Sequence, residues 1–534
     1  MPGKPRWDRE TALLAWLAAC VSFLAFSYYF RAGDILIYGD AVAHINIARR
    51  VFDSQTPGLL QLGTVWLPLQ HLLIMPFVIS DWMWRSGVGA SIPSMVAYVF
   101  TTVGVFRLVR ILLEERPAAA WIGAVIFGLN PNLLYLQSVA MTEVLYLALS
   151  IWSIEFFTAF VGGRSRGALM RCGWCVLGAC LTRYDAWFLA SALIIVAFWL
   201  RPQKRLLARF TLLALCGPML WIAYNAAVYR NPLEFANGPY SARAIERRSL
   251  EAGTAPHPGS GNILVAGLYF LKSAELNIAG TTALQRLWIA VALVGALSAV
   301  PQIRRNIPAL AKTPAAPTTV LLLCLPVPFY AWSIAHGSVP IYIPTWWPHT
   351  YYNTRYGIEL LLALSICGVL GVSVVLNLVR DLKLQRAFGF AALALILLSY
   401  ASIFRDPICA HEARANGQTR AALEKEVAQF LTALPANSTL LMYLGDHVGV
   451  LQQAGIPIRR VINEGNHRVW KRPADPNGLW EQALADPARF VDYTIAFAGD
   501  PVSQQAKKTG LATLAVLHVS GQPEAVIYRT GRSR

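Results

Sequence analysis

Long apolar segments alternate with short polar connections along the chain as far as residue 404. A helix needs roughly 20 apolar residues to cross the hydrocarbon core of a bilayer, and segments of about that length recur here. They predict about eleven membrane-spanning helices, near residues 11–30, 93–112, 118–136, 143–161, 168–182, 186–200, 209–228, 284–300, 317–335, 357–379 and 387–404. The pattern therefore predicts an all-α polytopic membrane protein.

The pattern changes after residue 404. Residues 405–534 hold no apolar segment long enough to span a membrane, and a helical stretch at 419–434 is followed by short apolar runs such as 494–497. Such mixed, short elements are typical of a small α/β domain. We therefore expect a transmembrane catalytic domain over residues 1–404 and a soluble α/β domain over 405–534.

Two long connections are expected on the outer side of the membrane, at about residues 31–92 and 229–282. The first contains an apolar stretch, 65–78, that is interrupted by prolines and polar residues. We interpret it as a juxtamembrane helix that lies in the interface rather than crossing. The second loop begins with a stretch rich in Gly, Pro and charge, and its second half, 262–278, predicts another interfacial helix.

Composition and charge support a membrane protein and fix its expected orientation. The 534 residues are 56% hydrophobic and 14% charged, with a mean hydropathy of +0.46, which is too apolar for a soluble globular protein. The net charge of +17 comes largely from basic clusters in alternate short connections, near 107–116, 164–171, 201–209, 304–312 and 380–386.

This placement follows the positive-inside rule and does not indicate nucleic acid binding. Lys4, Arg6 and Arg9 precede the first span, which lacks a cleavage site and is expected to stay as an anchor. The N-terminus is therefore expected in the cytoplasm. An odd number of spans then places the C-terminal domain outside the inner (plasma) membrane.

Ionisable side chains near a membrane are costly and tend to be functional. Four groups of them are expected together on the outer side: Asp40 with His44, Glu143, the run Arg183-Tyr184-Asp185, and Arg355. Asp40 and His44 are four residues apart and would share a face of a helix. A carboxylate and a cation on one face suggest an enzyme that acts on a phosphate-bearing lipid.

Each of these residues also has a structural interpretation. Asp40 and Glu143 could cap the helices that follow them. Arg183 and Asp185 could pair only to hold the fold. Arg355 could be an interfacial residue whose guanidinium reaches lipid headgroups.

Aromatic and histidine side chains leave two interpretations open. The run from Trp346 to Tyr352 contains Trp347 and fits an aromatic belt at the membrane interface, although it could equally line a sugar pocket. His71 and His349 are expected to be interface residues rather than ligands, and so is His44 when taken alone.

Taken together, these motifs resemble the GT-C superfamily of membrane glycosyltransferases. The motifs are Gly39-Asp40-Ala41-Val42-Ala43-His44, Thr142-Glu143, Arg183-Tyr184-Asp185 and Asn353-Thr354-Arg355-Tyr356-Gly357. The order and common sidedness are similar to the protein O-mannosyltransferase and aminoarabinose-transferase branch, which is glycosyltransferase family 39-like. The resemblance covers roughly residues 10–404.

The resemblance implies an inverting hexosyl- or pentosyltransferase. Such an enzyme transfers a sugar from a polyprenyl-phosphate donor to a lipid, glycan or protein acceptor on the extracytoplasmic face.

 In such enzymes the first-loop carboxylate, here Asp40, acts as the base on an acceptor hydroxyl, which is a poor nucleophile until its proton is removed. Glu143 matches a second acidic position, which orients the acceptor or the sugar. Arg355, with Tyr356 beside it, matches the position that binds the donor phosphate, where a fixed guanidinium stabilises growing negative charge.

The chain departs from the family pattern at two points. Asp40 is followed by Ala41, where many relatives have Asp-Glu, and Trp66-Leu67-Pro68 replaces a Lys before Pro in the juxtamembrane segment. Phosphate binding would then depend more on Arg355. The sequence identifies no certain cofactor, and a divalent metal is compatible with these carboxylates but not required. The alternatives are a lipid-linked glycan transporter or flippase, and a polysaccharide ligase or polymerase.

Overall fold

The computed structural model describes residues 8–113, 117–163, 165–304, 314–466 and 477–531. Its residues group into two compact units by their contacts. The bundle unit comprises Met1–Ala32, Pro93–Ile222 and Phe235–Glu412, and the sheet unit comprises Gly33–Ile92, Ala223–Glu234 and Ala413–Arg534. The first long loop therefore groups with the C-terminal segment, whereas the sequence pattern assigned it to the transmembrane domain.

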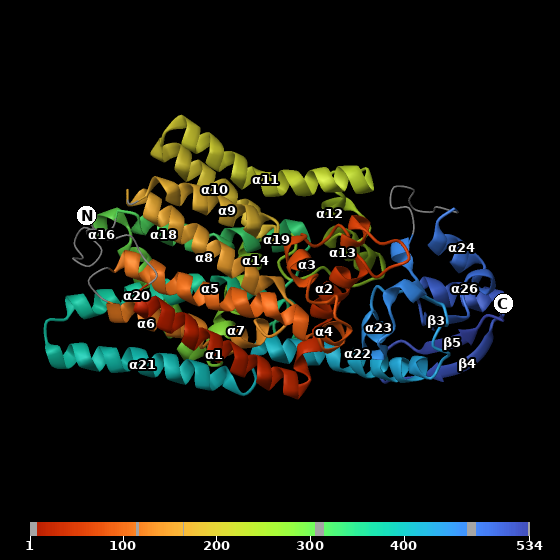
Figure 1. Cartoon of the computed structure of the whole chain (residues 1–534). Coiled ribbons are helices and arrows are strands. Elements are labelled where there is room, and N and C mark those ends of the chain that lie inside the picture. The colour runs from red at the N-terminus through yellow and green to blue at the C-terminus, as the bar shows by residue number, and fades with distance from the viewer. Residues whose placement is uncertain (1–7, 114–116, 164, 305–313, 467–476, 532–534) are drawn as a thin grey trace. The chain divides into compact units, whose positions relative to one another are not determined.

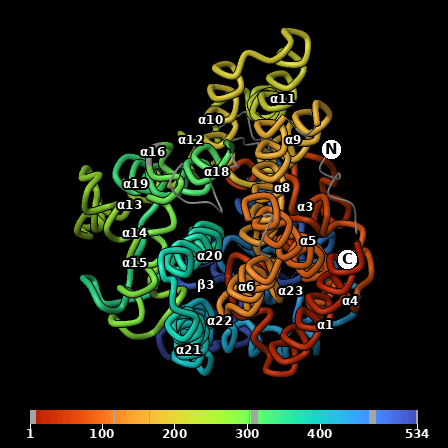
Figure 2. The backbone as a smooth tube through the Cα atoms, turned by 90° about the vertical axis from the view of Figure 1, so that its left-hand side faces the viewer, coloured from red at the N-terminus to blue at the C-terminus, as the bar shows by residue number. Residues whose placement is uncertain are grey.

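The bundle unit consists of helices (Figure 1). They are α1 (Arg9–Ala32), α5 (Val88–Leu112), α6 (Pro117–Gly128), α7 (Pro131–Leu136), α8 (Thr142–Val161), α9 (Arg166–Cys180), α10 (Asp185–Leu200), α11 (Lys204–Tyr229), α12 (Glu234–Asn237), α13 (Ala242–Glu251), α14 (Ile263–Ile278), α15 (Thr282–Ser298), α16 (Pro301–Arg304), α18 (Ala316–Leu323), α19 (Pro326–Gly337), η3 (Thr354–Leu360), α20 (Leu361–Leu378), α21 (Leu382–Phe404) and α22 (Ile408–Thr432). Helices α5, α11, α12 and α22 also contribute residues to the sheet unit. Figure 2 looks nearly along the axes of α6, α8 and α20, which are roughly parallel.

Seven helical segments within the described residues are long and apolar enough to cross a membrane. They are α1, α5, α8, α11, α18 with α19, η3 with α20, and the continuous stretch that contains α21. The pair α14 and α15 bends by 105° and would make an eighth if it were one span, while α6 and α10 are shorter apolar helices. The prediction of a polytopic, all-α membrane protein is confirmed.

One expected span, 118–136, is broken into α6 and α7. Asn130 is the N-cap of α7, and its side chain accepts a hydrogen bond from the Leu133 amide. Pro131 follows at the first helical position, where its missing amide hydrogen costs nothing, but it cannot continue the preceding helix. The Asn-Pro pair therefore ends one helix and starts the next.

Helices α15 and α20 pack backbone against backbone through two glycines. A Cβ atom on Gly295 would lie 1.8 Å from the Cys367 carbonyl oxygen, and one on Gly371 would lie 2.1 Å from the Val291 carbonyl oxygen. Real Cβ atoms do not approach that closely, so only glycine allows this separation of the helices.

Gly371→Ala is expected to lower the free energy of unfolding by about 1–3 kcal/mol, because the two helix backbones would have to move apart. Thermal unfolding of the purified protein in detergent measures this. Gly389→Ala is the matched control, since a Cβ at Gly389 meets no atom within 4 Å. Equal melting temperatures for the two variants would contradict the close packing.

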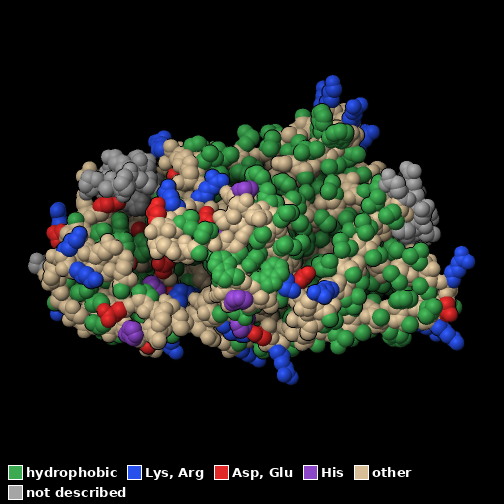
Figure 3. All heavy atoms as spheres, turned by 180° about the vertical axis from the view of Figure 1, so that it is seen from behind, with side chains coloured by type: hydrophobic (Ala, Val, Ile, Leu, Met, Phe, Trp, Pro, Cys, Tyr) green, Lys and Arg blue, Asp and Glu red, His purple; other side chains and the backbone are tan. Residues whose placement is uncertain are grey.

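Hydrophobic side chains cover much of the bundle face seen in Figure 3. On α11 and α21, for example, Leu212, Met219, Phe390 and Leu397 are at least 60% exposed. Such continuous apolar exposure on long helices is what a lipid-facing surface requires. The chain is therefore a multi-pass membrane protein.

The sequence pattern predicted that the basic clusters lie in the connections between helices. At least one of these residues does not. Arg107 lies inside α5, is buried, and forms an ion pair with Glu155 of α8 at 2.8 Å. A buried guanidinium needs such a partner. Parts of the basic clusters at 107–116, 164–171 and 304–312, together with Lys4 and Arg6, lie outside the described residues.

The sheet unit combines short helices with a five-stranded sheet. Its elements before the sheet are η1 (Asp34–Leu36), α2 (Gly39–Arg50), η2 (Leu59–Leu62), α3 (Leu69–Ile74) and α4 (Asp81–Ser86). Those that follow are β1 (Leu440–Met442), α23 (Gly449–Ala454), η4 (Ile458–Arg460), β2 (Val461–Ile462), η5 (Glu464–Asn466), α24 (Leu479–Ala485), α25 (Pro487–Phe490), β3 (Tyr493–Phe497), α26 (Pro501–Thr509), β4 (Ala512–Leu517) and β5 (Ala525–Arg529).

The strand order is β2-β1-β3-β5-β4. Strands β2, β1 and β3 are parallel, β5 pairs antiparallel with β3, and β4 pairs antiparallel with β5. The helices α24 and α26 lie beside the strands in Figure 1, and Trp480, Ala483 and Val502 from them join the sheet's apolar core. The predicted C-terminal α/β sheet is confirmed.

Candidate functional site

A cluster of buried charged side chains lies within the bundle unit, where several helices begin. Glu143 comes from the first turn of α8, and Asp185 is the first residue of α10. Arg183 lies in the connection just before Asp185, while Arg355 and Glu359 come from η3. The cluster therefore joins segments that are far apart in the sequence.

Arg183 is the cation at the centre of this cluster. Its Nε lies 2.9 Å from Glu359 Oε1 and 3.2 Å from Asp185 Oδ2, and its Nη1 lies 3.1 Å from Glu143 Oε1. Burial alone would lower the pKa of Arg183, but the surrounding carboxylates, Glu359 most strongly, raise it well above its ordinary value. The guanidinium is thus a fixed positive charge with three carboxylate partners.

Tyr330 of α19 completes this side of the cluster. Its hydroxyl accepts a hydrogen bond from Arg183 Nη2 at 2.7 Å and donates to Glu359 Oε1 at 2.9 Å. Asp185 Oδ2 lies 3.3 Å from the same hydroxyl. The tyrosine therefore links both carboxylates to the guanidinium.

Arg355 is held on the other side of Glu143. Arg355 Nε donates to Glu143 Oε1 at 2.9 Å, so this one oxygen bridges both guanidiniums. Arg355 Nη1 lies 3.5 Å from Glu412 Oε1 on α22. The Tyr356 ring centroid lies 5.1 Å from the Arg183 guanidinium carbon and 5.0 Å from that of Arg355, within range of cation–π attraction.

The segment that carries Arg355 is fixed by its backbone. Glu412 accepts hydrogen bonds from the Asn353 and Thr354 amides at 2.9 and 2.7 Å. The Thr354 carbonyl accepts from Ser273 and Asn277 of α14. Gly357 packs so closely on α14 that a Cβ there would lie 2.4 Å from the Ser273 carbonyl carbon. Arg355 is therefore a buried residue on a segment that is held by α14 and Glu412.

Carboxylates outnumber guanidiniums in this cluster. Glu143, Asp185, Glu359 and Glu412 surround Arg183 and Arg355. The Oε2 atoms of Glu143 and Glu359 are buried and have no hydrogen-bond partner among the described residues. Buried acceptors of this kind are available to a hydroxyl group or a water molecule.

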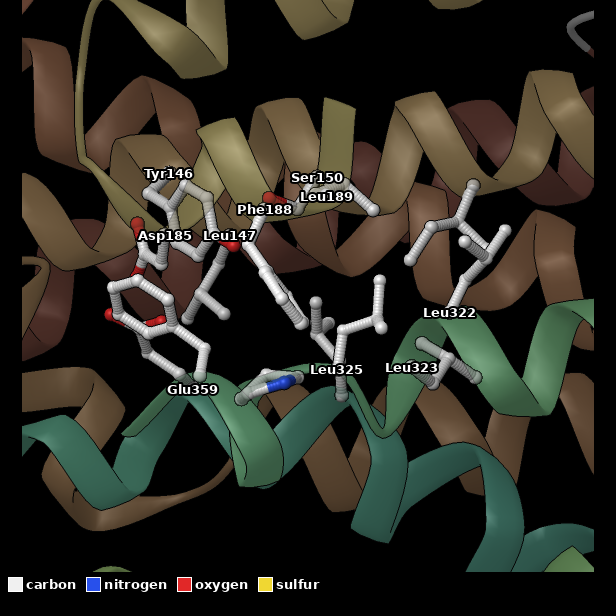
Figure 4. Close-up of a pocket in the computed structure, with 14 residues that line it drawn as sticks. Tyr146, Leu147, Ser150, Asp185, Phe188, Leu189, Leu322, Leu323, Leu325 and Glu359 are labelled. Atoms are coloured by element: carbon white, nitrogen blue, oxygen red, sulfur yellow. The ribbon is translucent and has the colours of Figure 1, made fainter. Parts of the chain in front are cut away.

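A small hollow adjoins the cluster (Figure 4), and its cavity volume is about 20 Å³. Tyr146, Asp185 and Glu359 lie at one end, and Leu322 and Leu323 lie at the other. The remaining lining residues are mainly apolar and come mostly from α8, α10, α19 and α20. The hollow therefore combines an acidic end with hydrocarbon walls.

Asp40 belongs to the sheet unit and lies at the second position of α2. The N-cap is Tyr38, so Asp40 is not the capping residue, and its side chain is half-buried. His44 follows one turn later and is buried, and its Nδ1 is hydrogen-bonded to His71 Nε2 of α3 at 2.8 Å. The expected shared face of Asp40 and His44 is thus present on a helix.

Helix α22 positions the start of α2 within the sheet unit. Arg414 Nη2 pairs with Asp34 Oδ2 at 2.6 Å, and Arg420 Nη2 donates to the Ile37 carbonyl at 2.9 Å. Gly417 lies so close to this segment that a Cβ there would be 2.1 Å from the Ile37 carbonyl oxygen. The residues just before Asp40 are therefore held by residues far along the chain. Asp34 and Arg414, for example, are 380 positions apart.

Of the residues predicted from sequence, the structure brings together Glu143, Arg183, Asp185, Arg355 and Tyr356. Other predicted residues have different surroundings. The Tyr184 hydroxyl accepts from Trp221 Nε1 at 3.1 Å, and the Tyr184 ring stacks on Phe235. Trp347 and Tyr352 are 52% and 46% exposed, as expected for an aromatic belt or an open pocket wall. Asp40 and His44 belong to the other unit.

Sequence reasoning missed Tyr330, Glu359 and Glu412. Glu359 has a local signal, because it follows Arg355 by four residues and would share its face of a helix. Tyr330 and Glu412 have none, since each is an isolated polar residue in a segment assigned to another role. Among the described residues, no group of three or more His, Cys, Asp or Glu side chains is arranged to hold a metal ion.

Solved structures share this architecture over nearly the full chain. ArnT from Cupriavidus metallidurans bound to undecaprenyl phosphate aligns with a TM-score of 0.57 at 13% identity, covering 98% of each chain. The apo state of the same protein gives 0.57 at 12% identity over 97% of each chain. The chain has a GT-C fold.

A further solved structure is less similar. Archaeal oligosaccharyltransferase AglB from Archaeoglobus fulgidus, in complex with an inhibitory peptide and a dolichol-phosphate, aligns with a TM-score of 0.46 at 12% identity. The alignment covers 99% of this chain and 75% of that one. No protein-family model and no curated protein matches the sequence. The alignment with ArnT, and not this weaker one, confirms the GT-C resemblance for the fold.

Proposed function

We propose that the protein is an integral-membrane glycosyltransferase that moves a sugar from a polyprenyl-phosphate donor to an acceptor on the extracytoplasmic face. The observation that carries the proposal is the GT-C fold, shared end to end with ArnT in a structure bound to undecaprenyl phosphate. The first-loop carboxylate Asp40, on its own helix, supports it.

In this proposal Asp40 is the general base. It accepts the proton of an acceptor hydroxyl as the oxygen attacks the anomeric carbon, and polyprenyl phosphate leaves with the electrons of the broken glycosidic bond. Attack from the face opposite the phosphate inverts the anomeric centre. The half-burial of Asp40 suits this role, because the carboxylate is partly shielded from water yet reachable by a substrate.

The buried cluster supports the donor side of the proposal. Glu143 fixes both Arg183 and Arg355 through one oxygen, so neither guanidinium needs to reorganise when charge develops nearby. Arg355 keeps the phosphate-binding role that the family resemblance implies, with Glu143 and Glu412 as the groups that orient it. The adjoining hollow is small, and its acidic end disfavours a phosphate there.

Arg355→Ala is expected to raise the KM for the lipid donor about 10-fold or more while changing the acceptor KM little, because a charge-assisted bond to phosphate is lost. Steady-state kinetics with each substrate varied in turn measures this. Arg107→Met combined with Glu155→Gln is the matched control, since it removes another buried ion pair of the bundle unit without leaving a charge unpaired. An unchanged donor KM in a folded Arg355→Ala variant would leave Arg355 with a structural role only.

The function is tested in cells by removing the protein. Mass spectrometry of cell-envelope lipids and glycans should show loss of a sugar from one product and accumulation of its lipid-phosphate donor. Complementation with the wild-type chain should restore the product, and complementation with Asp40→Asn should not. Unchanged envelope glycans and lipids in cells that lack the protein would contradict the proposal.

A further inference from the structure

Three buried polar atoms in the sheet unit have no hydrogen-bond partner among the described residues. They are Nε2 and Oε1 of Gln70 and Nδ1 of His71, adjacent residues in the first turn of α3. Both side chains are fully buried. Buried polar groups in native proteins are nearly always bonded, so unpaired atoms on two adjacent residues point to a bound molecule or an ordered water.

His44 lies beside His71, and Trp66 lies beside His44. His71 is hydrogen-bonded through Nε2 to His44, which leaves Nδ1 as its remaining polar atom. The Trp66 ring centroid lies 4.7 Å from that of His44, and the Trp66 side chain is half-buried. The site thus offers an amide, an imidazole nitrogen and an aromatic ring.

The charge of the site is low. Burial lowers the pKa of His71 well below its ordinary value, and the neighbouring His44 and Arg50 lower it further, so the ring is neutral. Arg50 Nε already donates to the Gln61 carbonyl at 2.7 Å. A neutral amide and a neutral imidazole are poor partners for phosphate and good partners for hydroxyl groups, which both donate and accept.

The site also lies beside the proposed base. His44 is one helical turn from Asp40 on α2, and α2 packs on α3 through the His44–His71 bond. A ligand that bonds to Gln70 and His71 is therefore close to the helix that carries the reacting carboxylate. The one substrate group that combines several hydroxyls with an apolar ring face for stacking is a sugar.

We propose that Gln70, His71 and Trp66 form the subsite that binds the sugar ring of the lipid-linked donor. This proposal rests on the proposed function and adds to it the residues that distinguish one sugar from another. Gln70 and His71 bond to ring hydroxyls, and Trp66 contacts a ring face. None of the three touches the lipid phosphate.

The test compares binding of two lipids to the purified full chain. One is undecaprenyl phosphate, and the other is whichever undecaprenyl-phosphate hexose or pentose from a synthetic panel the wild-type protein binds most tightly. Gln70→Leu and His71→Asn should each weaken binding of the sugar-bearing lipid about 10-fold to 100-fold and leave binding of undecaprenyl phosphate unchanged. Gln70→Glu keeps the size and an acceptor, and it serves as the second variant if Gln70→Leu does not fold.

Gln61→Leu is the matched control. Gln61 is a buried glutamine of the same loop, but its amide donates to Thr56 and to the Gly465 carbonyl, so its loss should not change the preference between the two lipids. Equal weakening of both lipids by the Gln70 variants would indicate a phosphate site and overturn the proposal. Unchanged binding of both would show that only water occupies the site. If the wild-type chain binds neither lipid, the proposed function itself fails.

Discussion

Replacing Asp40 with asparagine is expected to lower turnover about 10²-fold to 10⁴-fold, the range that general base catalysis supplies. Asparagine has the same size and can occupy the same position of α2, but its amide cannot take a proton from the acceptor hydroxyl. Asp40 is half-buried and is not the N-cap of its helix, so the change should leave the fold intact. Single-turnover transfer with saturating donor and acceptor measures the loss.

Asp81→Asn is the control for this variant. Asp81 lies in the same loop and pairs with Arg49 at 2.6 Å, but its side chain is 72% exposed. Arg49 is buried but keeps Asp53 as a carboxylate partner at 2.8 Å, so turnover should stay near the wild-type value. An Asp40→Asn protein that keeps turnover within about twofold of wild type would remove Asp40 from the reaction, since a lost base must cost more than that.

Arg183→Met is expected to have the largest effect on stability, at least about 3–5 kcal/mol, and to prevent accumulation of folded protein. The substitution leaves Glu359 and Asp185 buried without their shared cation. Glu143 keeps Arg355 as its remaining cationic partner. Buried carboxylates that lose a partner retain their desolvation cost. Thermal unfolding in detergent and resistance to trypsin measure the change.

Two companion variants show whether charge is the cause. Arg247→Met removes an arginine whose pair with Glu251 is exposed, and it should change the melting temperature little. Arg183→Met combined with Glu359→Gln should recover part of the loss, because one unpaired carboxylate is then neutral. A double variant no more stable than Arg183→Met would contradict this electrostatic account.

Hydrophobic patterning predicted the membrane class and most helix positions, because spanning helices need long apolar runs that are visible in any window. It missed the break at Asn130-Pro131, although the capping and proline signals were present in the sequence. It also placed Arg107 in a connection between helices, whereas in the structure Arg107 is buried and paired with Glu155. Partners 48 positions apart leave no mark in a local pattern.

The charged residues of the bundle cluster were predictable as a group, because Glu143, Arg183, Asp185 and Arg355 all lie where apolar segments begin or end. Their pairing was not. Glu412 bonds to the Arg355 segment from a region that the sequence assigned to a separate domain. Likewise, residues 33–92 group with 413–534 through contacts such as Arg414 with Asp34, which no local signal encodes.

The central claim is transfer of a sugar from a polyprenyl monophosphate, and a reconstituted assay tests it most directly. The purified chain is given a panel of undecaprenyl-phosphate sugars and the matching undecaprenyl-diphosphate sugars, with envelope lipids and glycans as acceptors. The account predicts sugar transfer and release of undecaprenyl phosphate from the monophosphate donors alone, and only when Asp40 is present. Turnover of the diphosphate donors instead, or movement of intact donor across the membrane without sugar release, would contradict it.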